Sequence, residues 1–334
     1  MLILFLVLFY GLQRYIVYGQ DGVYLDFNQN QTEQVGKDVP GDVSVDIVYD
    51  DPDYSDIQTT AGQDLEPIKA LYLSSDAVTA ENLADIQTQL AARGANALVL
   101  EMKNPKGVLS WYSSVPLAVS YGTNGTADLS ESISKLKDSG IYLVARISCC
   151  VDEYMALRNS PVALATSEGR VYSDDNGMWL DPSNSDVQNY VIDLSDELID
   201  LGFDEILLAN FAHPTDSDGT SLSYSQQSSV SLTPKVIISS FALSVREAVE
   251  AKGGKLSVLC DANSFRNGLA DQTGQDPDVF GKVFDRYYWT TDASVLTSDM
   301  AIAAQSIPQD SLSARFVPIM FSTDSTESWV YPYE

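Results

Sequence analysis

Residues 96–103 read NALVLEMK and residues 141–148 read IYLVARIS, and these two stretches decide the fold. Both are apolar runs with the length of a buried strand, and each follows a helical pattern that stops at a glycine, Gly94 or Gly140. Strands that alternate with amphipathic helices are typical of a parallel sheet covered by helices. The sequence therefore predicts an α/β fold.

The same alternation continues along the chain. Strand-like runs occur at residues 68–73, 96–103, 141–148, 203–210, 255–263, 283–289 and 315–320. Runs that alternate with helices in this way predict a (β/α)8 TIM-barrel-like fold whose last βα unit is short or missing, and the alternative is a doubly wound open sheet. An eighth strand would have to come from Trp329-Val330-Tyr331. In either fold, ligands bind at the carboxyl ends of the strands.

Polar side chains occupy the carboxyl ends of three predicted strands. Side chains alternate between the two faces of a strand, so Glu101 and Lys103 share the face opposite to their apolar neighbours. If the apolar face meets the helices, these two side chains point into the barrel mouth, as does Arg146 on the next strand. Asp261 and Asn263 reach the same rim from the strand 255–263. These groups form either a substrate site or a buried ion-pair ring that closes the top of the barrel.

Aromatic and titratable side chains in the long connections point to the same rim, because long loops in compact domains are usually lids or binding loops. Trp179 and Asp181 follow the third strand and could stack on a sugar and hydrogen-bond to it, although Trp179 could equally fill the core of its own loop. His213, the only histidine, follows the fourth strand and is a substrate-binding candidate or a structural group. Trp289 offers a further stacking surface.

The composition excludes several classes of function. The chain has 19 Lys and Arg against 47 Asp and Glu, a formal charge of −28, which disfavours nucleic acid as a partner. Cys149 and Cys150 are adjacent and Cys260 stands alone, so no spacing resembles a metal clip or a disulfide framework. We therefore expect no metal and no cofactor.

The N-terminal part divides the chain into three segments. Residues 1–12 are almost wholly apolar, which favours a hydrophobic anchor over residues 1–18, with a buried apolar helix as the alternative. Residues 19–66 are polar and acidic and are predicted to form a largely disordered spacer. Residues 67–334 form the predicted barrel domain. An anchor, a spacer and a globular unit suit a membrane-anchored, extracytoplasmic protein of the bacterial cell envelope.

Four short motifs follow one another along the predicted barrel: Glu101-Met-Lys103-Asn104, Ala145-Arg146-Ile147, Trp179-Leu-Asp181-Pro182 and Gly202-Phe203-Asp204-Glu205-Ile206. In this order they resemble a bacterial domain-of-unknown-function family of glycosidase-like TIM-barrel proteins. The resemblance covers about residues 67–290. It implies a carbohydrate-active barrel with a carboxylate at the position of Glu101 and an acidic residue at the mouth of the fourth strand.

The fourth strand departs from the pattern of that family. Ala209 stands where the resemblance implies a carboxylate, and Ala212 stands where it implies an arginine. By strand alternation, the neighbouring Asn210 is expected to point away from the mouth and to be a poor replacement. Glycoside hydrolysis normally needs two carboxyl groups about 5–9.5 Å apart, so one member of the pair is missing.

The sequence thus predicts a glycoside-hydrolase-like barrel that binds or acts on polysaccharide or cell-wall glycan through a degenerate or altered site. One alternative is an active glycosidase in which Asp261 or Asp181 works beside Glu101, and another is a non-catalytic scaffold of the envelope. The candidate substrate-binding residues are Lys103, Arg146, Trp179, His213, Asn263 and Trp289.

Overall fold

The computed structural model describes residues 16–19, 22–25, 60–215, 222–223, 232–321 and 326–332. The chain divides into two compact units, residues 1–50 and 51–334. In the first unit, β1 (Ile16–Gly19) and β2 (Gly22–Leu25) form an antiparallel pair. Residues 1–15 of the predicted anchor and residues 20–21 and 26–59 of the predicted spacer lie outside the described residues. Within the described part, no helix is long and apolar enough to cross a membrane.

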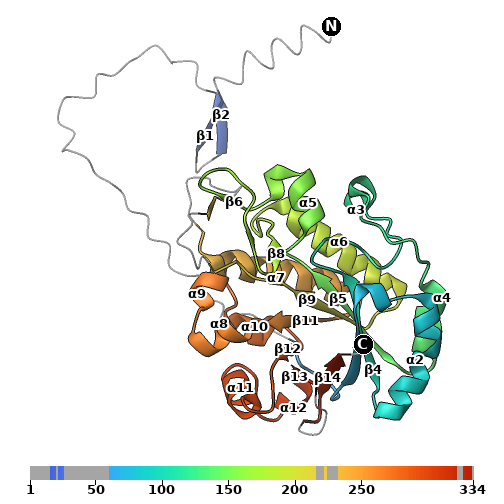
Figure 1. Cartoon of the computed structure of the whole chain (residues 1–334). Coiled ribbons are helices and arrows are strands. Elements are labelled where there is room, and N and C mark those ends of the chain that lie inside the picture. Colours follow the sequence, from blue (N-terminus) through green and yellow to red (C-terminus); the bar gives the residue numbers. More distant parts are fainter. Residues whose placement is uncertain are drawn as a thin grey trace, which may run out of the picture. The chain divides into compact units, whose positions relative to one another are not determined.

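The second unit contains a closed barrel of parallel strands (Figure 1). The strands are β3 (Lys69–Leu73), β4 (Ala97–Lys103), β5 (Tyr142–Ser148), β9 (Glu205–Ala209), β11 (Lys255–Cys260), β12 (Tyr287–Thr290), β13 (Phe316–Ile319) and β14 (Trp329–Pro332). All the predicted strands are present, and β14 closes the barrel because Trp329 pairs with Lys69 and Val330 pairs with Ala70. The predicted TIM-barrel-like fold is confirmed, with Trp329-Val330-Tyr331 in the eighth strand.

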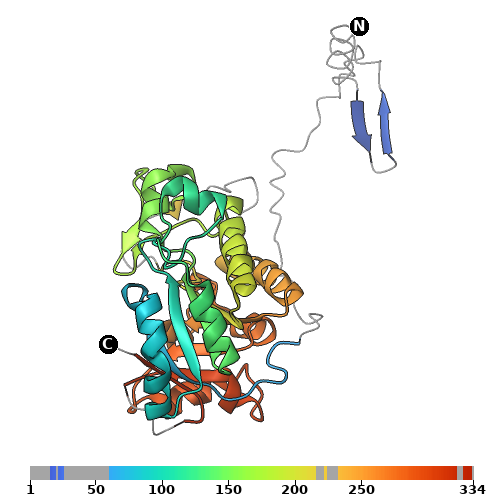
Figure 2. The same cartoon turned by 90° about the vertical axis from the view of Figure 1, so that its right-hand side faces the viewer.

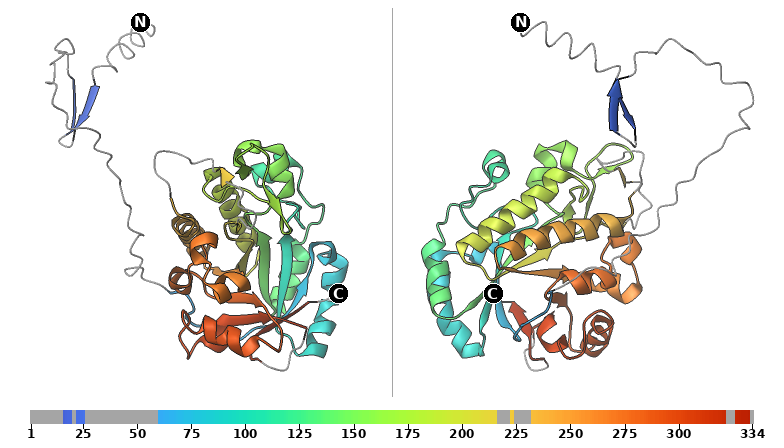
Figure 3. Two further views of the ribbon diagram at one scale, coloured as in Figure 1. Left: turned by 60° about the vertical axis from the view of Figure 1, so that its left-hand side comes forward. Right: turned by 180° about the vertical axis from the view of Figure 1, so that it is seen from behind.

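Helices cover the outside of the strands (Figures 1 and 2), and α6 and α7 lie side by side (Figure 3). The helices of this layer are α2 (Ala80–Arg93), α4 (Ser130–Asp138), α6 (Ser185–Leu201), α7 (Pro234–Ala251), α10 (Pro277–Val283), α11 (Leu296–Ala303) and α12 (Leu312–Arg315). Their ends follow the sequence signals: Thr79 accepts a hydrogen bond from the Asn82 backbone N–H at 3.1 Å, and Gly94 ends the same helix with φ 63°. The cap of α6 is Asn184, whose side chain accepts a hydrogen bond from the Asp186 backbone N–H.

Short elements fill the connections above the carboxyl ends of the strands. They are η1 (Ser75–Ala77), α3 (Pro116–Tyr121), α5 (Glu153–Arg158), η2 (Ser160–Val162), β6 (Ala165–Thr166), β7 (Ser173–Asp174), β8 (Gly177–Met178), β10 (Leu222–Ser223), α8 (Ala262–Asn267) and α9 (Ala270–Thr273). Strands β7 and β8 pair as a small hairpin within the long connection that follows β5. The fold therefore places its longest irregular segments on the side of the barrel where strands end.

Strand alternation separates two apolar cores. Leu98 and Leu100 of β4 belong to the larger core between strands and helices, whereas Ala97 and Val99 belong to a smaller core inside the barrel. The expectation that large apolar residues of this strand meet the helices is thereby confirmed. The interior of the barrel is consequently filled in layers, as in other closed parallel barrels.

The floor of the barrel contains a buried ion pair. Glu205 at the start of β9 pairs with Arg286, which directly precedes β12, and both side chains are at most 2% exposed. The two carboxylate oxygens of Glu205 also accept hydrogen bonds of 2.8 Å, one from the Tyr142 hydroxyl and one from the Tyr288 hydroxyl. Burial raises the pKa of both tyrosines, so they remain neutral donors. Residues from β5, β9 and β12 are thus tied to one carboxylate.

Residues 60–66, which precede the first strand, are part of this floor. The Gly62 N–H donates to the Asp285 carboxylate at 2.9 Å, and the Arg286 guanidinium donates to the Glu66 carbonyl at 2.9 Å. Gly62 has φ 78°, and a Cβ there would lie 2.4 Å from Nε of Arg315, so only glycine fits. The barrel unit therefore begins before the boundary at residue 67 that the composition suggests.

We predict that Glu205→Ala lowers the free energy of unfolding by about 3–5 kcal/mol, because it leaves the Arg286 guanidinium buried without its counter-ion. Urea denaturation followed by circular dichroism measures the change. Glu168→Ala is the matched control, since Glu168 pairs with Arg170 at the surface, where both side chains are at least 70% exposed. Equal effects of the two substitutions would contradict a structural role for the floor.

Candidate functional site

Glu101 and Arg146 meet at the barrel mouth, as the sequence predicts. The two residues are paired in register on β4 and β5, and their side chains form an ion pair. The other oxygen of the carboxylate accepts a hydrogen bond of 3.0 Å from the Ser75 backbone N–H, and the Tyr72 hydroxyl also bonds to Glu101. Burial, with Glu101 nearby, raises the pKa of Tyr72 to about 12. Protein donors therefore already surround the Glu101 carboxylate.

Lys103 does not point into the mouth, and that prediction is wrong. A bulge between Glu101 and Lys103 shifts the register, so that Lys103 lies opposite Ile147, whose side chain belongs to the outer core. Its ammonium group pairs with Asp152 at 2.8 Å and donates to the Ser148 carbonyl at 2.7 Å, and it is 1% exposed. Lys103 thus fastens the start of the long connection after β5 and is not available to a substrate.

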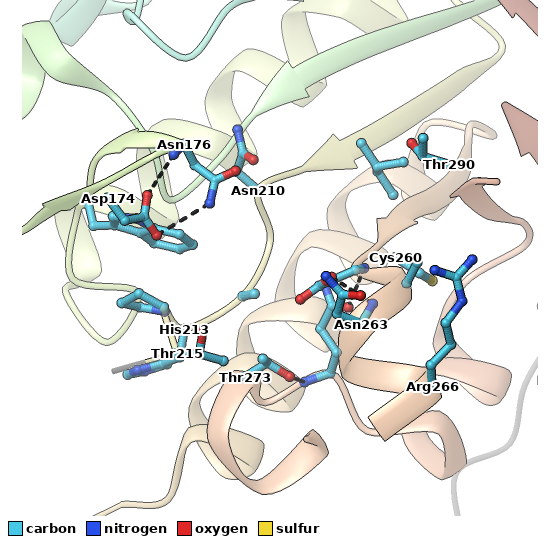
Figure 4. Close-up of a pocket in the computed structure, with 17 residues that line it drawn as sticks. Asp174, Asn176, Asn210, His213, Thr215, Cys260, Asn263, Arg266, Thr273 and Thr290 are labelled. Atoms are coloured by element: carbon cyan, nitrogen blue, oxygen red, sulfur yellow. Dashed lines mark hydrogen bonds between the residues drawn. The ribbon is translucent and has the colours of Figure 1, made fainter. Parts of the chain in front are cut away.

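A cavity of about 560 Å³ opens beside the mouth, at the carboxyl ends of β9, β11 and β12. Figure 4 shows Asp174, Asn176 and Asn210 on one side of it and Cys260, Asn263 and Arg266 on the other. Trp179, Asp261 and Thr290 also line it. Glu101 and Arg146 are not among its lining residues, so the site predicted as one rim consists of two separate groups.

Trp179 and Asp181 follow β8, and the structure separates them. Trp179 lines the cavity, although it is only 4% exposed. Asp181 is fully buried and does not line the cavity, and one of its oxygens accepts hydrogen bonds from the backbone N–H and the hydroxyl of Ser183, at 2.8 and 2.6 Å. Asp181 is therefore not placed to act as a catalytic carboxylate, contrary to that candidate assignment.

Asp261 and Asn263 reach the cavity from the start of α8 and not from the strand itself, because β11 ends at Cys260. Asp261 is the N-cap of this helix: its carboxylate accepts from the Asn263 N–H at 3.0 Å and from the Ser264 hydroxyl at 3.0 Å. Both Asp261 and Asn263 are exposed to the cavity. Of the three proposed catalytic carboxylates, Asp261 alone lines the cavity.

Trp289 is not a stacking surface for a ligand. It is fully buried in the outer core, where its ring packs edge-on against Phe265, at 5.2 Å between centroids, and in a tilted arrangement against Phe316, at 5.9 Å. Its partner in the neighbouring strand, Cys260, also belongs to the outer core. The earlier assignment of Trp289 to substrate binding is wrong, because this position of β12 faces the helices.

Asn210 is a cavity residue that strand alternation misses. β9 ends at Ala209, which is buried on the inner side, and Asn210 then adopts the left-handed conformation with φ 49°. This turn brings its side chain to the cavity, where Nδ2 donates to the Ser148 hydroxyl at 2.9 Å. Asn is one of the few residues with a side chain that tolerate such a φ. An Asn directly after a predicted strand is therefore the sequence feature that could have indicated this turn.

His213 lines the cavity but is 2% exposed, and its backbone N–H donates to the Thr273 carbonyl at 2.8 Å. Burial lowers the pKa of His213 to about 4, against a smaller opposing effect of Asp181. The imidazole is therefore neutral at pH 7 and contributes no charge to the site. In the part of the chain that the structure describes, no three His, Cys, Asp or Glu side chains come together as a metal site.

We predict that the protein loses stability as the pH falls from about 6.5 to 5. The unfolded chain binds a proton on His213 near pH 6.5, whereas the folded chain binds it only near pH 4, so acid favours unfolding by roughly 2 kcal/mol at pH 5. Melting temperatures across this range test it, and His213→Gln should flatten the dependence because the chain has one histidine. An unchanged slope in the variant would contradict the assignment.

The comparisons with known proteins agree with this architecture. The chain shares its fold with the glycoside hydrolase domain of PgaB (BpsB) from Bordetella bronchiseptica, with a TM-score of 0.58 and 10% identity over 80% of this chain and 94% of that one. It also matches a hypothetical protein from Ruminiclostridium thermocellum, with 25% identity and a TM-score of 0.49 over 56% of this chain and 96% of that one. No protein with a curated description matches. Residues 70–286 match the family model described as "Putative glycosyl hydrolase domain", and the chain belongs to that family.

Proposed function

We propose that the protein binds polysaccharide or cell-wall glycan in the cavity beside the barrel mouth without hydrolysing it. The observation that carries this proposal is the lining of the cavity. Asn176, Asn210 and Asn263 contribute amides, Thr290 contributes a hydroxyl, and Trp179 contributes an aromatic ring. Aromatic surfaces with a few placed polar groups are what a neutral, hydroxyl-rich ligand requires. Membership of a glycosyl hydrolase family also supports a carbohydrate ligand.

The surroundings of the carboxylates favour binding over turnover. Glu101 is 7% exposed and is engaged by Arg146, Ser75 and Tyr72, so little of its carboxylate is left to act as a general acid that must protonate a leaving group. The position of the expected second carboxylate holds Ala209. Both halves of the usual pair are therefore compromised, one by its contacts and one by its replacement.

A hydrolytic alternative has one specific observation in its favour. Asp174 and Asp261 both line the cavity and both are exposed. Two carboxyl groups at one cavity could act as acid and base if their separation suits a sugar. In this alternative, the reaction has moved from the barrel axis to the cavity over β11.

The proposed location is the extracytoplasmic side of a bacterial membrane. The apolar N-terminal residues support an anchor, and the acidic segment that follows them supports a spacer that extends through its own repulsion. Cell-wall glycan would then lie within reach of the barrel. A full chain that remains with the membranes until detergent extracts it would support the anchor. Recovery of the full chain in the soluble fraction would contradict it.

We predict that the full-length protein sediments with insoluble cell-wall glycan and releases no reducing ends from it. Asn263→Ala should weaken this binding about five- to tenfold, the usual effect of one lost hydrogen bond. The matched control is Asn267→Ala at the other end of α8, because Asn267 is exposed and does not line the cavity. Release of reducing ends that Asp261→Asn abolishes would replace the binding function with the hydrolytic one.

A further inference from the structure

We infer that Asn210 is the residue that selects the ligand of this cavity, and that it selects a sugar that brings hydrogen-bond donors and carries no negative charge. The inference rests on the proposed glycan-binding function and adds to it the chemical class of the sugar. It comes from three observations on the described residues: the backbone of Asn210, the contacts of its side chain, and the balance of donors and charge in the cavity.

The backbone of Asn210 is in the left-handed conformation, which glycine adopts more readily than asparagine. Among the described residues, Asp64 and Asn210 are the two non-glycine residues with positive φ, at 54° and 49°. Glycine adopts this conformation freely, and the chain uses glycine at its other left-handed turns, such as Gly94 and Gly202. Side chains retained at such positions commonly belong to functional sites. The side chain of Asn210 therefore needs an explanation beyond the turn.

The contacts of Asn210 hold its amide in one orientation. Nδ2 donates to the hydroxyl of Ser148, which is fully buried and in turn donates to the Val151 carbonyl at 2.8 Å. One of the two Nδ2 hydrogens is thereby used by the protein. Oδ1 has no hydrogen-bond partner among the described residues, and Asn210 lines the cavity. The chain thus fixes an amide that offers its Oδ1 acceptor to a ligand, beside the second hydrogen of Nδ2.

Other described side chains of the cavity also present acceptors and negative charge. One Nδ2 hydrogen of Asn176 is likewise donated to the protein, through a 3.3 Å bond to Asp174. Asp174 and Asp261 add two carboxylates. Among the described residues of the lining there is one cationic side chain, Arg266, and its guanidinium is paired with buried Asp299 by bonds of 2.7 and 2.6 Å. Asp174 and Asp261 consequently leave the described lining with an excess of negative charge.

This balance sets the class of ligand. A uronic acid or a phosphorylated sugar would bring negative charge next to Asp174 and Asp261, and the described residues of the lining include no unpaired Lys or Arg to offset it. A sugar with hydroxyl and amine donors satisfies the free acceptors, and a protonated amine gains electrostatic attraction as well. The amide of Asn263 can donate or accept, so it does not change this order. We expect the cavity to bind glucosamine units most tightly, N-acetylglucosamine units less tightly and uronic acids most weakly.

The test uses the full-length chain and three soluble probes of equal length: a glucosamine oligomer, its N-acetylated counterpart and an oligogalacturonate. Isothermal titration should give affinities in the order stated. Asn210→Gly should weaken binding of the glucosamine oligomer about tenfold and should reduce the differences in affinity among the three probes. Its melting temperature should stay the same or rise. Asp64→Gly is the matched control, since it removes the same backbone strain at the barrel floor and should leave all affinities unchanged.

The outcomes separate this inference from the function on which it rests. Wild-type affinity and selectivity in Asn210→Gly would overturn the inference while leaving glycan binding in place. Tightest binding of the oligogalacturonate would overturn it too. A drop in melting temperature that matches the loss of affinity would reduce Asn210 to a structural role. Failure of the wild-type chain to bind any of the three probes would overturn both the proposed function and the inference.

Discussion

The barrel depends on the ion pair and the hydrogen bonds of the buried Glu205 carboxylate. Arg286, Tyr142 and Tyr288 converge on it from neighbouring parts of the wall, and the same guanidinium holds residue Glu66 beneath the floor. A charge in a barrel interior is costly unless its partners are complete, and here each oxygen has them. The floor therefore fixes the relative heights of β5, β9 and β12. The carboxyl ends of β9 and β12 border the cavity, so their registers also position the lining residues.

An acid paired with an arginine occurs at both ends of the barrel. At the mouth, Glu101 and Arg146 form a pair that resembles the floor pair in its near-complete set of protein donors. Such a pair stabilises the wall between β4 and β5 but leaves little of the carboxylate for chemistry. The accessible polar groups lie to one side, over β9, β11 and β12. In the proposed function, Glu101 is therefore part of the framework, and the ligand contacts lie over β9, β11 and β12.

The fold could be predicted from the sequence almost completely, because apolar periodicity and helix end signals report on interactions that are local. The site could be predicted only in part, because single backbone irregularities redirect its side chains. The bulge at Lys103 directs a side chain that was expected at the mouth toward the outside of the barrel. The positive φ of Asn210 directs its side chain toward the cavity. Trp289 is a different case, since alternation with Tyr288 would have placed it correctly in the outer core.

The two irregularities have one feature in common: the buried polar groups beside them are paired within the protein. Beyond the bulge, the ammonium group of Lys103 and the carboxylate of Asp152 satisfy each other, and Lys103 also takes up the Ser148 carbonyl. The Ser148 hydroxyl is then left to bridge the Val151 carbonyl and the amide of Asn210. The orientation of the cavity amide is therefore linked through Ser148 to a structural ion pair outside the barrel. A substitution at Lys103 would act on ligand binding through this chain of contacts, without Lys103 touching the ligand.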